Sequence, residues 1–195
     1  MGKIYCLMGK SSSGKDTIYN EILRRKDDRL NKIVLYTTRP IRDGETDGVS
    51  YHFVTKEDFL KQKKEQKVIE YRSYETMYGE WIYFTADDGQ FHLEEKDYLI
   101  IETLESYLSL YKYFGKDKVV PIYIEVDDGI RLQRALNRER AQDEPKYTEM
   151  CRRFLADEQD FSEKKLKDAK VCRRFFNEDI KKTCDAILSY IQTYQ

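Results

Sequence analysis

The sequence has few cysteines and histidines, and this shortage limits the metal sites and cross-links that it can form. Its four cysteines include no Cys-x-x-Cys pair, and only two histidines are present. A zinc site needs several of these residues at short spacings, so we do not expect one. The cysteine pattern indicates no disulfide framework, and we expect a cytoplasmic protein with reduced thiols.

The sequence also lacks a long apolar run and a clear excess of either charge. No stretch approaches the ~20 apolar residues that a membrane-spanning helix needs, and the N-terminus does not resemble a signal peptide. Charged residues make up 36% of the chain, yet the formal net charge is only −1. Nucleic-acid-binding proteins usually carry a basic excess, so we expect neither a nucleic-acid nor a membrane partner.

Apolar segments alternate with helix-like segments in the first and last parts of the chain. In the helix-like segments apolar residues recur every three or four positions, whereas the apolar runs are short and rich in strand-forming residues. Strands are expected at 3–8, 32–38, 98–102, 119–126 and 169–176, and helices at 14–25, 103–114, 127–140, 147–166 and 178–193. This alternation predicts an α/β fold with a parallel sheet flanked by helices.

The middle of the chain has a different pattern. It is rich in glycine and aromatic residues, and short alternating stretches surround one expected helix at 56–66. This indicates a small β-rich lobe inserted into the core. The polar stretch AQDEPK at 141–146 indicates a mobile helical lid. The predicted domains are a core of 1–38 and 97–195, with the lid at about 131–150, and an inserted lobe of 39–96.

The stretch GKSSSGKDT, residues 9–17, lies between the first expected strand and the first expected helix. Its glycines and lysine match the G-x-x-x-x-G-K pattern of a phosphate-binding loop (P-loop). Glycine allows positive φ angles, the backbone N–H groups form a nest for an anion, and the helix N-terminus adds partial positive charge. The lysine would reach the β- and γ-phosphates of a nucleoside triphosphate. The predicted ATP-binding residues here are Gly9, Ser11, Ser12, Ser13, Gly14, Lys15, Asp16 and Thr17.

Asp16 stands where the loop pattern has a serine or threonine. Its carboxylate could hold Mg²⁺, directly or through water, because hard cations prefer oxygen ligands. Alternatively, Asp16 only stabilises the first turn of the helix against the helix dipole, with the Thr17 hydroxyl nearby. We predict a metal role for Asp16.

The next motif is TTRPIRDGETDGVSYHFV, residues 37–54. Arg39 and Arg42 are suited to forked contacts with a phosphate, and the phenol of Tyr51 could reach the same anion. Together with the loop at 9–17, this string closely resembles the guanylate kinase family. The resemblance covers most of the chain and is strongest at 4–54.

The resemblance implies a fold, a reaction and a set of residues. In that family the second motif binds the phosphate of GMP, which implies this role for Arg39, Arg42 and Tyr51, with Arg39 also catalytic. The stretch IEYRSYETMYG at 69–79 resembles the later half of the same pocket. It implies that Glu70 accepts from the N1 and N2 donors of guanine and that Tyr78 contacts the phosphate. The implied fold is a P-loop NTPase core, and the implied reaction is transfer from ATP, with Mg²⁺, to GMP or dGMP.

The sequence departs from the family pattern in the acceptor pocket. Leu35 and Glu80 stand where the family usually carries hydroxyl residues, and the chain is one residue short between Glu70 and Tyr78. The family's paired aspartates after the pocket are reduced here to the stretch IETLE at 101–105, in which Glu102 is the best candidate for the matching carboxylate. The preference for guanine is therefore less firmly implied than the transfer reaction.

The segment RLQRALNRER places Arg131, Arg134 and Arg138 on one helical face. Arginines on a mobile element can neutralise the charge of a transferring phosphoryl group. The resemblance implies this catalytic role for Arg134, Arg138 and Arg153, whereas Arg131 could equally belong to a solvated helix face. It also implies that Asn177 touches the adenine of ATP, although a helix cap explains Asn177 equally well.

Two other functions remain open. The loop also resembles that of ribose 1,5-bisphosphate kinase, which phosphorylates a sugar phosphate. The chain could instead be a non-catalytic guanylate-kinase-like module that binds proteins. The intact loop and the match at Glu70 favour a guanylate kinase with small-molecule nucleotides as partners.

Overall fold

The computed structural model describes residues 1–25, 30–76 and 79–194. The larger of its two sheets has five parallel strands in the order β2-β7-β1-β8-β9. These strands are β1 (Ile4–Met8), β2 (Leu30–Lys32), β7 (Asp97–Ile101), β8 (Val119–Glu125) and β9 (Arg174–Phe176). The predicted α/β fold is confirmed, and β9 forms one edge of the sheet.

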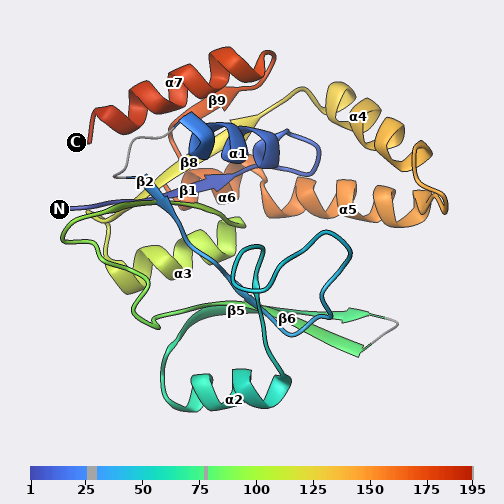
Figure 1. Ribbon diagram of the computed structural model, residues 1–195. Helices are drawn as coiled ribbons and strands as arrows, with labels where there is room; N and C mark the ends of the chain where they lie inside the picture. The colour runs from blue at the N-terminus through green and yellow to red at the C-terminus, as the bar shows by residue number, and fades with distance from the viewer. Residues whose placement is uncertain (26–29, 77–78, 195) are drawn as a thin grey trace.

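Helices cover both faces of this sheet (Figure 1). The side chains of β1 alternate between two hydrophobic clusters, because successive residues of a strand point to opposite faces. One cluster packs against α1 (Lys15–Arg25) and α7 (Ile180–Gln192). The other packs against α3 (Leu104–Phe114) and α6 (Glu163–Asp168). β1 is buried along its whole length, which fixes the loop that follows it.

The smaller sheet has four strands in the order β4-β3-β6-β5 and lies below the core in Figure 1. β5 (Val68–Thr76) and β6 (Gly79–Ala86) form a long antiparallel pair. β3 (Tyr36–Thr37) pairs with β6 and, in parallel, with β4 (His52–Phe53). Phe59 of α2 (Lys56–Lys64) fills a separate hydrophobic cluster on this sheet.

The single strand expected at 32–38 is wrong, because two short strands in different sheets occupy this stretch. β2 ends at Lys32 in the larger sheet, and β3 begins at Tyr36 in the smaller one. Between them, the backbone N–H of Val34 donates to the side chain of Gln90 rather than to a strand partner. The chain therefore crosses from one sheet to the other within an apolar run, and the domain boundary near residue 38 stays a prediction.

The helix expected at 147–166 is also divided. α5 (Tyr147–Asp160) ends before Phe161, and α6 begins after Ser162. Phe161 and Leu166 both enter the same hydrophobic cluster. Five residues apart, they would point in different directions on one continuous helix, so the break lets both reach the core.

The region expected to be a lid consists of α4 (Asp128–Arg140), a turn, and α5, which pack against each other. They extend together from the right-hand side of the core in Figure 1. In the part of the chain that the structure describes, no helix is both long and apolar enough to cross a membrane.

Candidate functional site

The loop at 9–17 connects the carboxyl end of β1 to the first turn of α1. A Cβ atom on Gly9 would lie 2.8 Å from the carbonyl oxygen of Ile124, so a side chain here would press on β8. Gly14 has a φ of +84°, and its Cβ would lie 2.6 Å from the amide nitrogen of Asn177. Both glycines are therefore required by the packing of the loop, and Gly14 also by its backbone conformation.

The residues that begin α1 carry the polar groups expected to meet a triphosphate. Lys15 is half-buried, and it makes no hydrogen bond or ion pair with any other described residue. Asp16 and Thr17 are exposed beside it. The loop thus brings together a backbone nest, a helix N-terminus and an uncompensated positive charge, which is the arrangement that attracts an anion.

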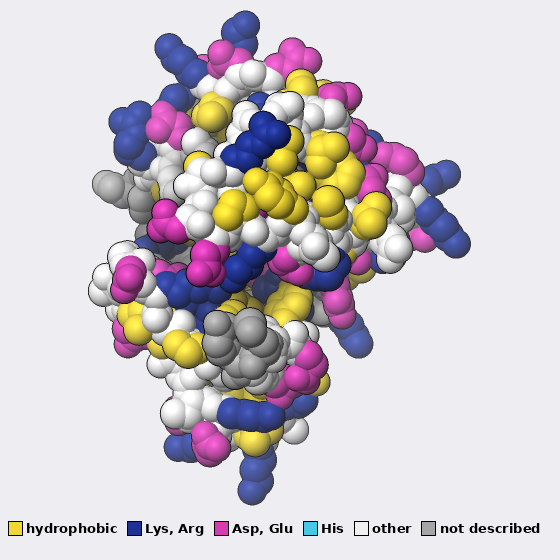
Figure 2. All heavy atoms as spheres, turned by 90° about the vertical axis from the view of Figure 1, so that its right-hand side faces the viewer, with side chains coloured by type: hydrophobic (Ala, Val, Ile, Leu, Met, Phe, Trp, Pro, Cys, Tyr) yellow, Lys and Arg dark blue, Asp and Glu magenta, His cyan; other side chains and the backbone are white. Residues whose placement is uncertain are grey.

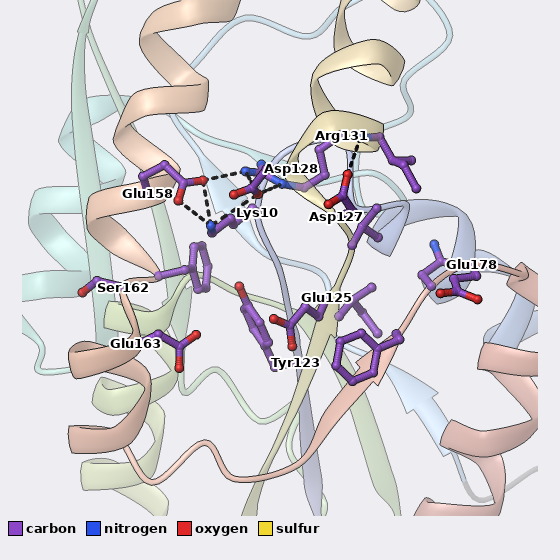
Figure 3. A pocket seen from close by; sticks show the side chains of 16 residues that line it. Lys10, Tyr123, Glu125, Asp127, Asp128, Arg131, Glu158, Ser162, Glu163 and Glu178 are labelled. Atoms are coloured by element: carbon purple, nitrogen blue, oxygen red, sulfur yellow. Dashed lines mark hydrogen bonds and ion pairs between the residues drawn. The ribbon is translucent and has the colours of Figure 1, made fainter.

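Ion pairs attach the start of this loop to the base of the lid (Figure 3). Lys10 donates to both carboxylate oxygens of Glu158 at 2.7 Å. Arg131 donates to Asp128 and Glu158, each at 2.7 Å, and to the carbonyl oxygen of Ser11 at 3.1 Å. Arg131 is only 1% exposed, so the solvated-face interpretation of this residue is wrong. Its position indicates that it fixes the loop relative to α4 and α5.

Asn177 follows β9 and also supports the loop. Its side chain is 2% exposed, and its amide donates to the carbonyl oxygen of Ser13 at 2.8 Å. The helix cap before α7 is Asp179, which accepts from the N–H of Lys182, so the cap interpretation of Asn177 is wrong. Its contact with adenine stays a prediction.

The three lid arginines differ in their surroundings. Nη1 of Arg134 lies 4.0 Å from the point that a Gly14 Cβ would occupy, so this side chain reaches the loop. Arg138 is exposed, and neither Arg134 nor Arg138 forms an ion pair within the described residues. Arg153 lies 4.0 Å from the buried carboxylate of Glu139. The structure therefore brings Arg134 to the loop, while Arg138 and Arg153 lie farther along the lid.

A second cluster of charges lies in the smaller sheet and its loops. Arg39 follows β3, is 4% exposed, and forms a forked pair with Glu45 at 2.5 and 2.7 Å. The rings of Tyr51 and Phe53 lie 5.2 and 5.3 Å from its guanidinium. The pair with Arg39 lowers the pKa of Glu45 to about 2. Glu45 also accepts from the backbone N–H of Arg42, and thus contacts both predicted phosphate-binding arginines.

Glu70 lies on β5 at the junction with the core. It is 6% exposed, and its two carboxylate oxygens accept from the hydroxyls of Thr85 and Ser106 at 2.7 and 2.8 Å. Glu102 lies at the end of β7 and is 3% exposed. Burial, reinforced by Glu70 and opposed by Arg72, raises the pKa of Glu102 to about 8. The structure thus brings the two carboxylates predicted for the base pocket together.

Two departures from the family pattern have structural explanations. Glu80 forms an ion pair with Lys56 at 2.6 Å, which compensates its negative charge. Leu35 packs against the hydrophobic cluster under β1 and β7. Tyr78 lies outside the described residues, and its contact with a phosphate stays a prediction.

Sequence analysis missed three residues of the base pocket, which are Arg72, Thr85 and Ser106. Arg72 lies two positions after Glu70 on one strand, so strand alternation places both side chains on the same face. The two-residue spacing of Glu70 and Arg72 in the sequence could therefore have identified Arg72. Thr85 on β6 and Ser106 on α3 are 15 and 36 residues from Glu70, and only the folded chain brings them to it.

The two clusters face each other across a hollow. Figure 2 shows lysine and arginine side chains gathered in this hollow, between the body that carries the loop and the lobe below it. Tyr19 on α1 is near enough to Tyr51 for the two phenols to interact, and burial together with this neighbour raises the pKa of Tyr19 to about 12. Tyr19 is one helical turn beyond Lys15, so the loop and the arginine cluster border the same space.

Comparisons with known proteins agree on one family. The family model for guanylate kinase matches residues 1–194. The guanylate kinase of Schizosaccharomyces pombe is 43% identical over 74 residues, which cover 37% of each chain. That of Mesoplasma florum is 40% identical over 73 residues, which cover 37% of this chain and 25% of the relative. That of Thermotoga maritima is 30% identical over 144 residues, which cover 71% of this chain and 67% of the relative.

The crystal structure of guanylate kinase from Anaplasma phagocytophilum superposes with a TM-score of 0.70 at 20% identity. The superposition covers 100% of this chain and 86% of the other. At this identity the likeness establishes the fold alone. Several of the sequence relatives are matched over less than two thirds of their own length, including the first two above.

Proposed function

The chain belongs to the guanylate kinase family, and we propose that it transfers the γ-phosphoryl group of ATP to GMP or dGMP, releasing ADP. The observation that carries this proposal is the pairing of two sites across one hollow. The P-loop with its unpaired lysine occupies one side. The other side holds the two predicted phosphate-binding arginines, Arg39 and Arg42, and the buried carboxyl groups of Glu70 and Glu102.

Phosphoryl transfer between two nucleotides requires the protein to position the reactants and to neutralise their charge, rather than to form a covalent bond with them. The phosphate oxygen of a nucleoside monophosphate is already a competent nucleophile, so no general base is needed. Lys15 would neutralise charge on the donor phosphates, and Arg134, close to Gly14, would do the same for the transferring group. Arg39, with Arg42 and Tyr51, would hold the acceptor phosphate in line with the donor.

Mg²⁺ fits this site only as a partner of the nucleotide. No group of three or more potential metal-ligating side chains occurs within the described residues. Asp16 and Thr17 present exposed oxygens at the start of α1, where they would hold the ion together with ATP phosphates. The ion would supply neutralisation of the phosphate charge there.

An ADP-release assay with a panel of acceptors tests this function. We would supply MgATP with GMP, dGMP, AMP, UMP or ribose 1,5-bisphosphate and measure initial rates. Release with GMP and dGMP at rates at least about 100-fold above the others is expected, because the carboxylates of the pocket match donors that adenine lacks. The proposal would be contradicted if ADP were released only with ribose 1,5-bisphosphate, or if none of the acceptors led to ADP release.

A further inference from the structure

Arg72 lies between Glu70 and Glu102, the two carboxyl groups predicted for the base pocket. It lies on the same face of β5 as Glu70 and has a side chain only 17% exposed. Its Nε is 3.5 Å from a carboxylate oxygen of Glu70, and its Nη2 is 3.3 Å from one of Glu102. Tyr71, the residue between Glu70 and Arg72, points to the opposite face, where Lys63 donates to its hydroxyl.

The single guanidinium of Arg72 lies beside both carboxyl groups, but part of the hydrogen-bonding capacity of this pocket is unused. Within the described residues, the buried Nε of Arg72 and both carboxylate oxygens of Glu102 have no hydrogen-bond partner. Thr85 and Ser106 lie near Glu102 as well and oppose the rise of its pKa, but each hydroxyl has only one hydrogen and donates it to Glu70. Burying polar groups without hydrogen-bond partners lowers the stability of the fold, unless a ligand supplies the missing partners.

The chemistry of the missing ligand follows from these groups. Guanine presents two donors, N1–H and the 2-amino group, next to one acceptor, O6. The carboxylate of Glu70, already oriented by two hydroxyls, can accept from both donors. The acceptor O6 then needs a donor in the same pocket. Leu35 offers none, and the Thr85 and Ser106 hydrogens are committed, whereas the Arg72 guanidinium has N–H groups that are not.

We propose that Arg72 determines base specificity by donating to O6 of guanine while Glu70 accepts from N1–H and the 2-amino group. In this arrangement the carboxyl group of Glu102, 3.3 Å from Nη2 of Arg72, positions the guanidinium. The inference deepens the proposed function and rests on it. Arg72 reads the atom that distinguishes a 6-oxopurine from adenine, which carries an amino donor at that position.

A thermodynamic cycle between the side chain and O6 tests this contact. We would measure equilibrium binding, KM and kcat for GMP and for 6-thio-GMP, whose sulfur is a weak acceptor. Arg72→Ala should weaken GMP binding on the order of 10- to 100-fold, as expected for a hydrogen bond to a charged group. It should weaken 6-thio-GMP binding less than about threefold, because the lost bond is weak there. KM should carry most of the change, and Arg72→Lys should restore part of it.

Two further variants separate base reading from structural effects. Lys63→Ala removes a cation from the same lobe but from the opposite face, and GMP binding should not change. Arg72→Ala leaves buried carboxylates without their counter-charge, which can unfold the lobe. Arg72→Ala/Glu102→Gln also replaces the ionisable Glu102 by a neutral amide, so it should fold. Relative to Glu102→Gln alone, it should still lose more affinity for GMP than for 6-thio-GMP.

The outcomes are distinct. Equal losses for GMP and 6-thio-GMP would mean that Arg72 only neutralises the carboxylates, and this would overturn the inference. A wild-type chain that binds GMP but transfers no phosphoryl group would contradict the proposed function, while the binding cycle would still decide the role of Arg72. A wild-type chain that binds no 6-oxopurine nucleotide would overturn both.

Discussion

The two sides of the hollow are built in different ways. On the donor side, backbone geometry forms the site, and Lys15 is left without an ion-pair partner within the described residues. On the acceptor side, side chains form the site, and the buried cations are already paired with acids. Arg39 is bound by Glu45, and Arg72 lies between Glu70 and Glu102.

This difference has consequences for how each side responds to change. The donor loop binds an anion through the positions of its backbone N–H groups. A single added carbon atom that moves the backbone can therefore disrupt anion binding. On the acceptor side, acids already neutralise the arginines. An incoming phosphate must therefore compete with Glu45 for Arg39, and a base must bind the unused groups around Arg72. The affinity and stability of this side should depend on charge, and therefore on pH. The predictions below test these two sensitivities.

The largest effect is expected from Gly14→Ala, with Gly44→Ala as its matched control. Both glycines have positive φ, at +84° and +79°, but a Cβ on Gly14 meets Asn177 whereas one on Gly44 meets nothing within 4 Å. Each variant should lose about 1–2 kcal/mol of stability from backbone strain. Only Gly14→Ala should lose ADP affinity, by more than roughly 100-fold, because the nest of N–H groups must shift.

Calorimetric titration with ADP and urea unfolding measure these two quantities separately. If both alanine variants bound ADP as the wild type does, the loop would tolerate a change of shape, and the contrast between the two sides would fail.

A smaller effect is expected from the pH dependence of Glu102→Gln. Because the pKa of Glu102 is raised to about 8 in the folded state, the folded chain retains a proton that the unfolded chain loses near pH 4.5. This stabilisation is fully present below pH 4.5 and is lost as the pH rises to about 8, with a slope of at most about 1.4 kcal/mol per pH unit.

Urea unfolding of both proteins between pH 3 and 9 checks this dependence. Glu102→Gln should flatten the curve between about pH 4.5 and 8. It should leave the acid side unchanged, where the low pKa of Glu45 makes stability fall as the pH drops below 4.5. Parallel curves for wild type and variant across the neutral range would contradict the assignment of Glu102.

Sequence reasoning succeeded where structure depends on neighbours along the chain. The order β1, loop and α1 is confirmed, because a buried strand, two glycines and a periodic helix are consecutive. It failed where one apolar run serves two sheets, as between β2 and β3. Of the two alternatives for Arg131, the solvated face was wrong, because the carboxylate of Glu158, 27 residues away, makes a buried arginine possible. The catalytic roles of the other arginines stay predictions.

Hydrogen–deuterium exchange with each nucleotide alone tests most directly the central claim that donor and acceptor bind on opposite sides of one hollow. ADP with Mg²⁺ should slow exchange in the loop at 9–17 and leave the smaller sheet unchanged. GMP should slow exchange around Arg39, Tyr51 and Glu70 and leave the loop unchanged. Protection of the same segment by both nucleotides, or none in the lobe with GMP, would contradict the account.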